Sequence, residues 1–312
     1  MINKLFFTNM SKKKRLMGLA FLLVIIIGFT FLFYFNTINI KRVIKFANSE
    51  YIIDSVSLKK PVVYIGVISR YPPNIIYRGY QPILDYLTSK TNYRFELKLS
   101  DDYNQAVSKL INKEVVAAFL GSYVYTLAHK EYNVIPILKP LNENFEPFSR
   151  SVLITNSTSD IYSINDIKRK KIALPSKESF SSNWLLKSEL KKHHLEESDL
   201  SEIKNFPHHQ SVIHNVANKY YDVGVTREYL VKKITDGTIR VLLYSDPFPT
   251  SPIVVAADYP RQIVDEIKKY LLEINKNNPK RELITKNWDY EFIYGFVEAT
   301  DRDYNIIRKI DK

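Results

Sequence analysis

The chain has 312 residues, which is enough for one large or two modest lobes, and it contains no cysteine. The lack of cysteine excludes disulfides, thiol catalysis, cysteine-ligated zinc and lipid attachment through an N-terminal cysteine. The formal net charge of +12 is spread along the chain without any nucleic-acid-binding motif, so we expect no nucleic-acid partner. A basic average instead favours the capture of anionic solutes.

The first predicted element is a membrane anchor at residues 16–36, which are almost wholly apolar and carry no charge. This run is long enough to cross a hydrocarbon core of ~30 Å. Residues 1–15 form a basic segment that ends in Lys12–Arg15, and the positive-inside rule keeps it in the cytoplasm. No small-residue cleavage motif follows, so we favour an uncleaved anchor in the inner membrane over a signal peptide. Residues 37–60 are then a stalk, and the rest of the chain lies in the periplasm or outside the cell.

Short apolar strands then alternate with amphipathic helices. Strands are expected at residues 63–68, 94–99 and 115–120, and helices at 80–87 and 104–111. Such alternation predicts a parallel α/β sheet. Ligands of these sheets gather at the carboxyl ends of the strands, which here carry Ser69, residues 101–103 and residues 121–122.

A second series of elements begins with a strand expected at residues 151–155. Further strands are expected at 171–174, 202–206, 221–226 and 239–244, and helices at 183–192 and 210–219. Residues 251–256 are expected to return the chain to the first lobe, which helices near 261–275 and 304–309 complete. We therefore predict an α/β fold in which lobe 1 comprises residues 61–150 with 250–312 and lobe 2 comprises 151–249, with the ligand cleft between them.

The order and spacing of several short motifs in the first lobe resemble one known family. The matching pieces are Gly66-Val67-Ile68, residues 80–87, Asp102-Tyr103, residues 117–121 and residues 125–128. They resemble the phosphate/phosphite/phosphonate-binding proteins of ABC importers, the PhnD-like family, and the similarity extends over residues 61–311. This resemblance implies a two-lobed type II periplasmic-binding-protein fold, here preceded by one transmembrane helix. It also implies delivery of a small oxyanion to an ABC permease and its ATPase.

The resemblance further implies a phosphoryl-binding loop at a helix start. Ser179 and Ser181 match a family motif whose hydroxyls and amides hold phosphoryl oxygens, whereas Phe180 and Ser182 replace the family's threonine and glycine. Without the resemblance, the spacing of these serines suggests an ordinary helix N-cap.

Two further residues match ligand-binding positions of the family. His209 stands where the family has a binding histidine, and Tyr103 stands where it has a tyrosine that donates to the anion. The alternatives are a surface histidine for His209 and an aromatic residue packed on the core for Tyr103. We expect Tyr103, Ser179, Ser181 and His209 to converge on one cleft.

Three other family positions set the expected ligand class. Glu228 matches a glutamate that faces the ammonium group in aminoalkylphosphonate binders, although a solvated helix start is the alternative. Ser149 and Ser251 stand where the family has tyrosine and aspartate. Because the partner aspartate is missing, an aminophosphonate is less expected than a phosphonate, phosphite or phosphate-like anion.

No motif for a nucleophile elbow, a P-loop, a zinc protease or a dinucleotide site is present, so we expect no enzyme activity, cofactor or metal. The pairs Asp101-Asp102 and Asp301/Asp303 each precede a helical stretch and are interpreted as helix caps. The alternative function is a ligand-sensing or interaction module that signals through a partner membrane protein. The predicted anchor favours it, because a fixed tether limits shuttling.

Overall fold

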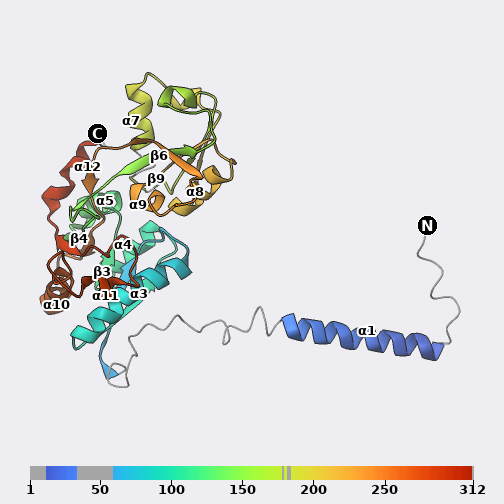
Figure 1. Cartoon of the computed structure of the whole chain (residues 1–312). Helices are drawn as coiled ribbons and strands as arrows, with labels where there is room; N and C mark the ends of the chain where they lie inside the picture. The colour runs from blue at the N-terminus through green and yellow to red at the C-terminus, as the bar shows by residue number, and fades with distance from the viewer. Residues whose placement is uncertain (1–11, 34–58, 178, 181–183, 311–312) are drawn as a thin grey trace. The chain divides into compact units, whose positions relative to one another are not determined.

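The computed structural model describes residues 12–33, 59–177, 179–180 and 184–310 (Figure 1). The chain divides into two units, residues 1–50 and residues 51–312. In the first unit, Lys12–Phe33 form helix α1. Among the described residues, no helix combines the length and the apolarity that crossing a membrane requires. Part of the predicted anchor, residues 34–36, and most of the predicted stalk lie outside the described ranges.

A six-stranded sheet forms one half of the second unit, with the order β13-β4-β12-β3-β1-β2. Its strands are β1 (Val62–Val67), β2 (Arg94–Leu99), β3 (Ala117–Phe119), β4 (Ile135–Pro140), β12 (Ile253–Val255) and β13 (Phe296–Glu298). Strands β1, β2 and β3 are parallel, whereas β12 is antiparallel to both of its neighbours, β3 and β4, and β13 is antiparallel to β4. The three strands from which a parallel sheet was predicted are indeed parallel, and the returning chain adds β12 in the opposite direction.

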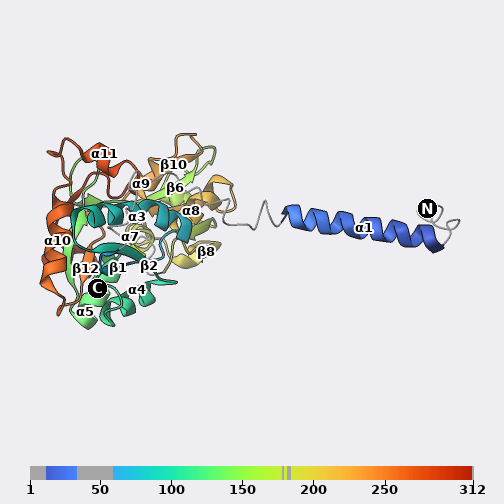
Figure 2. The ribbon, with the colours of Figure 1, turned by 90° about the horizontal axis from the view of Figure 1, so that it is seen from below.

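Helices cover both faces of this sheet. One face packs against α3 (Pro73–Lys90) and α10 (Arg261–Leu272) through an aromatic-rich cluster that includes Tyr80, Trp288 and Phe292. The other face packs against α4 (Tyr103–Ile111), α5 (Ser122–Tyr132) and α12 (Asn305–Ile310). Figure 2 shows β1 and β2 between α3 on one side and α4 and α5 on the other. A short helix α11 (Arg281–Thr285) precedes Trp288.

A five-stranded sheet with the order β10-β6-β9-β7-β8 forms the other half. Its strands are β6 (Ser151–Asn156), β7 (Lys171–Leu174), β8 (Glu202–Asn205), β9 (Val223–Arg227) and β10 (Ile239–Tyr244). Strand β6 is antiparallel to both of its neighbours, and β7 is parallel to β8 and β9. Helices α7 (Leu185–Lys192) and α8 (His209–Ala217) contribute to separate apolar clusters, and α9 (Glu228–Val231) follows β9.

Two chain segments join the halves and pair with each other. They are the two-residue strands β5 (Phe148–Ser149) and β11 (Phe248–Pro249), which are antiparallel. The chain therefore forms a two-lobed, mixed α/β unit, which Figure 1 shows with β6, β9, α7 and α8 toward one end and β3, β4, α3 and α10 toward the other.

The element boundaries differ from expectation where proline is involved. Helix α3 begins at Pro73, well before the predicted start at Tyr80, because proline is favoured in the first helical turn. Strand β4 was not predicted because it contains Pro136 and Pro140, which lack the N–H group that a sheet uses.

Candidate functional site

A small cavity lies between the two halves of the second unit. Its volume is ≈ 10 Å³, and its lining comes from both sheets: Ile68, Arg70, Tyr103, Gly121, Ser122, Tyr123, Ser179, Phe180, His209, Arg227 and Tyr229. These residues follow β1, β2, β3, β7 and β8 or stand at the end of β9. The central position of the cavity at the carboxyl ends of these strands is where α/β sheets usually bind their ligands. We call this space the central cavity.

Three of the predicted site residues line the central cavity together, namely Tyr103, Ser179 and His209. Ser181 lies outside the residues that the structure describes. The other three lie elsewhere: Ser149 and Glu228 line a second cavity, and Ser251 is buried without a hydrogen-bond partner for its hydroxyl among the described residues. The structure therefore brings three of the seven predicted residues together at the central cavity, and their role in binding stays a prediction.

His209 connects the serine loop to the five-stranded sheet. It is the first residue of α8, and its Nε2 lies 3.3 Å from the Ser179 hydroxyl while its Nδ1 lies 3.4 Å from the hydroxyl of Thr226 in β9. Burial of the ring lowers the pKa of His209 well below the ordinary histidine value, and the nearby charges of Arg227 and Arg70 lower it further. The ring is therefore neutral at physiological pH and has one N–H to donate.

Two arginines that sequence reasoning missed also face the central cavity. Arg70 follows β1, and its Nη1 lies 2.5 Å from Oε2 of Glu291, so its charge is neutralised inside the protein. Arg227 ends β9 and is only 5% exposed. Within the described ranges, its Nη1 has no hydrogen-bond partner and no ion pair includes it. Its guanidinium instead lies 5.3 Å from the centre of the Phe248 ring. The available signal was its position at the carboxyl end of a buried strand.

Phe180 forms the apolar side of the central cavity. Its ring is 3% exposed and lies 4.6 Å from the Phe248 ring and 5.2 Å from the Trp184 ring, with which it stacks. An aromatic side chain therefore stands where the resembling family has threonine, directly beside the polar groups.

A larger cavity of ≈ 360 Å³ lies near the connecting strands, and we call it the outer cavity. Its lining includes Ser149, Glu228, Lys232, Tyr290 and Glu291, and it shares Tyr229 with the central cavity. The ammonium of Lys232 lies 2.8 Å from Oε1 of Glu228 and also pairs with Glu143. Glu228 is therefore already neutralised by a residue of the chain itself.

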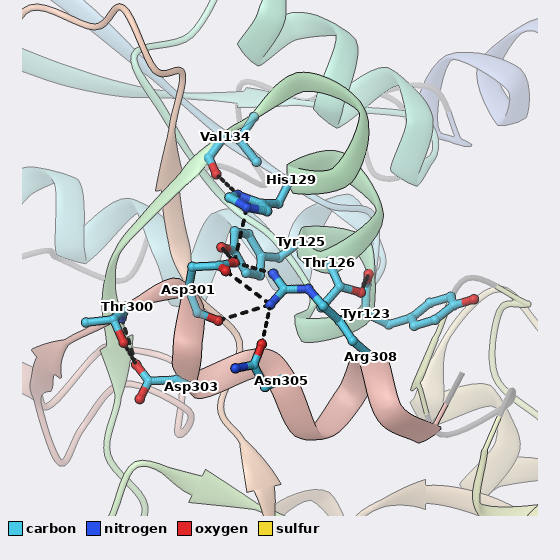
Figure 3. Close-up of polar contacts among 10 residues, drawn as sticks. All are labelled: Tyr123, Tyr125, Thr126, His129, Val134, Thr300, Asp301, Asp303, Asn305 and Arg308. Atoms are coloured by element: carbon cyan, nitrogen blue, oxygen red, sulfur yellow. Dashed lines mark hydrogen bonds and ion pairs between the residues drawn. The ribbon is translucent and has the colours of Figure 1, made fainter. Parts of the chain in front are cut away.

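Two of the four paired aspartates, Asp102 and Asp303, take part in helix caps, as predicted. The side chain of Asp102 accepts from the backbone N–H of Gln105 and caps α4. Asp303 forms a capping box with Thr300. Asp301 accepts a 2.6 Å hydrogen bond from the Tyr125 hydroxyl and pairs with Arg308, and Figure 3 shows these side chains, with His129, gathered between α5 and the C-terminal helix.

Comparison with known proteins gives one family and a consistent fold. The family model described as "ABC transporter, phosphonate, periplasmic substrate-binding protein" matches residues 65–304. A binding protein component of an ABC phosphonate transporter from Pseudomonas aeruginosa is similar at 19% identity with a TM-score of 0.70, over 81% of this chain and 86% of that one.

Two further solved structures share the fold. PhnD1 from Prochlorococcus marinus, in complex with methylphosphonate, is similar at 16% identity with a TM-score of 0.68, over 80% of this chain and 96% of that one. A Xanthomonas citri protein bound to ATP is similar at 16% identity with a TM-score of 0.61, over 81% of this chain and 96% of that one. At these identities the likeness shows the fold alone.

Proposed function

Because this chain belongs to the family of periplasmic substrate-binding proteins of phosphonate ABC transporters, we propose that it binds a small phosphonate-like oxyanion in the central cavity and delivers it to an ABC permease and ATPase. The family consists of extracytoplasmic solute-binding proteins rather than enzymes.

The observation that carries the proposed ligand class is that the buried charge of Arg227 has no acidic partner among the described residues. A buried charge is unfavourable unless an opposite charge or hydrogen bonds compensate for it. Arg227 is 5% exposed, lines the central cavity and has no acidic partner within the described parts of the chain. An oxyanion bound in the central cavity supplies the missing negative charge, and a guanidinium donates to such an anion through two N–H groups at once.

Neutral donors complete the proposed site. Ser179, Tyr103 and His209 line the same cavity and carry O–H and N–H groups suited to phosphoryl oxygens. Ser181 belongs to the proposal through the sequence motif alone. Glu228 is paired with Lys232, and Ser149 and Ser251 carry no charge, so these three residues favour a ligand without an ammonium group.

We also propose the division into two lobes at the paired connections, with residues 61–150 and 250–312 in lobe 1 and residues 151–249 in lobe 2. Two observations support this division. Strands β5 and β11 lie at the two junctions, and the five-stranded sheet takes all its strands from between them, whereas the six-stranded sheet takes its strands from before β5 and after β11. Opening and closing about these connections is the expected hinge motion of such a fold.

Finally, we propose that residues 16–36 anchor the chain in the inner membrane as a single pass. Support comes from the uncharged run and from the exposed apolar side chains of α1, which include Phe21 at 69% and Phe29 at 72% exposure. Membrane fractionation with N-terminal sequencing tests this, and a soluble product beginning after residue 36 would reject it. If the anchor is confirmed, a second function remains open, in which the chain is a sensor that acts through a partner membrane protein. Co-purification with a permease would favour transport, and co-purification with a membrane sensor protein would favour sensing.

Titration calorimetry on the full chain in detergent tests the ligand class. Methylphosphonate, phosphite and inorganic phosphate are compared with the amine-bearing 2-aminoethylphosphonate. We expect binding of at least one ligand without an amine and weaker binding of the aminophosphonate. Absence of binding for all of them would overturn the proposed function.

A further inference from the structure

The side chain of Phe180 connects the two lobes. In sequence it belongs to the loop that follows β7 of the five-stranded sheet. In space its ring is buried within the apolar cluster on one face of the six-stranded sheet, together with Ile68, Tyr103 and Leu120. Phe248 and Trp184 enclose the ring, at 4.6 Å and 5.2 Å between ring centres. The contact therefore holds one lobe against the apolar core of the other.

The inserted ring also limits the space beside the charged groups. Phe180 lines the central cavity with Arg227, Ser179 and His209, and the remaining volume of ≈ 10 Å³ accommodates about one water molecule. A phosphonate carries several oxygens and a substituent around one phosphorus atom, and each oxygen is about as large as a water. A tetrahedral oxyanion therefore does not fit while the ring occupies this position.

Building on the proposed function, we infer that Phe180 is a specificity-determining plug, whose ring occupies the ligand's place in the structure and leaves it when an oxyanion binds. Withdrawal of the ring exposes apolar surface to water, so the inserted state is favoured. The apparent affinity for an oxyanion is reduced by the fraction of molecules in which the ring has withdrawn. A smaller side chain at this position removes the competition between ring and ligand.

Substitution of the plug in the full chain tests this inference with methylphosphonate as the probe. We expect Phe180→Thr to bind methylphosphonate about tenfold more tightly than the wild type or better, and Phe180→Leu to lie between the two. The matched control is Tyr304→Leu, which removes a buried ring from the same cluster, packs against Tyr125 and does not line the central cavity. It should lower the melting temperature without tightening binding.

Fluorescence gives a second readout that needs no change at Phe180. The chain has two tryptophans, so Trp288→Phe leaves Trp184, which stacks on the plug, as the only one. We expect its emission to change when methylphosphonate binds. This readout decides the question if Phe180→Thr and Phe180→Leu fail to fold.

The outcomes separate the plug from the proposed function. If the wild type binds methylphosphonate, the folded Phe180 variants bind it no more tightly and the Trp184 emission stays constant, the plug is wrong and oxyanion binding stands. If neither the wild type nor any Phe180 variant binds an oxyanion, the proposed function is overturned and the plug falls with it.

Discussion

The two walls of the central cavity each contribute one buried arginine, but the protein treats the two differently. Arg70, on the wall of the six-stranded sheet, is paired with Glu291, and both side chains are 5% exposed. Arg227, on the wall of the five-stranded sheet, is buried to the same degree and has no acidic partner in the ranges that the structure describes. The protein itself compensates one charge, and under the proposed function the ligand compensates the other. On that proposal the first wall is a fixed framework and the second is the recognition wall.

The largest expected effect tests the framework wall. Replacement of Glu291 by glutamine leaves the Arg70 charge buried and uncompensated, so the free energy of unfolding should fall by about 3–5 kcal/mol. Urea denaturation measures this loss. The control is Glu298→Gln, because the pair of Glu298 with Lys268 has side chains that are 61% and 30% exposed and should contribute at most ~1 kcal/mol. Equal losses in the two variants would contradict a structural role for the Arg70 pair.

The next effect tests the recognition wall. Arg227→Met should weaken methylphosphonate binding by roughly ten- to a hundredfold, since a hydrogen bond to a charged group is lost. The same variant should keep or increase the stability of the ligand-free protein, because an uncompensated buried charge disappears. Calorimetry and urea denaturation give the two numbers. Arg78→Met, on the exposed side of α3, makes the same change in net charge and should alter neither; a large loss of stability in Arg227→Met would count against the comparison.

A smaller effect concerns the neutral donors of the recognition wall. Ser179→Ala and His209→Gln should each weaken methylphosphonate binding by roughly tenfold, because each removes or displaces one donor while Arg227 remains. His214→Gln changes an exposed histidine of the same helix α8 and should bind like the wild type. The site assignment fails if the first two variants also bind like the wild type.

The smallest effect is a dependence of stability on pH. Burial, with help from Arg227 and Arg70, holds the pKa of His209 well below the ordinary value of 6.5. Below that value the unfolded chain binds a proton at this position and the folded chain does not, so the free energy of unfolding falls as the pH falls, by up to about 1.4 kcal/mol per pH unit. Above it the stability is fully present.

Urea denaturation from about pH 8 to about pH 5 measures this slope, because this pH range is the one in which histidines titrate. His209→Gln should reduce it. Part of the slope should remain, because burial also lowers the pKa of His208. An unchanged slope in His209→Gln would show that His209 is not the titrating group.

Local sequence patterns predicted several of the strands and the edge of the sheets at which the central cavity lies. Several predicted strands match the observed ones, namely residues 94–99, 171–174 and 239–244, which form β2, β7 and β10. A buried strand can be recognised from the apolar side chains of its own residues. The family motif singled out Ser179 and His209, which follow β7 and β8 by a few residues and both line the central cavity.

The missing parts of the site depend on contacts between distant residues. Arg227 has the same sequence context as many arginines at strand ends. Only the folded chain shows that Arg70 is paired with Glu291, 221 residues away in sequence, whereas Arg227 has no carboxylate partner among the described residues. The sequence likewise showed that Phe180 replaces a threonine, but its insertion into the opposite lobe depends on Phe248 and Trp184. Pairing and packing of this kind leave no local pattern.

The place of β12 in the six-stranded sheet has a consequence for the order in which the chain acquires its structure. Strand β12 separates β3 from β4, although it is made more than a hundred residues after them. During synthesis and export, the six-stranded sheet of the first lobe therefore lacks a central strand until β12 is made. The five-stranded sheet comes from one continuous stretch of chain and is complete by Tyr244. The lobe that begins first in the chain is thus expected to finish last, because its central contacts close the longest loop.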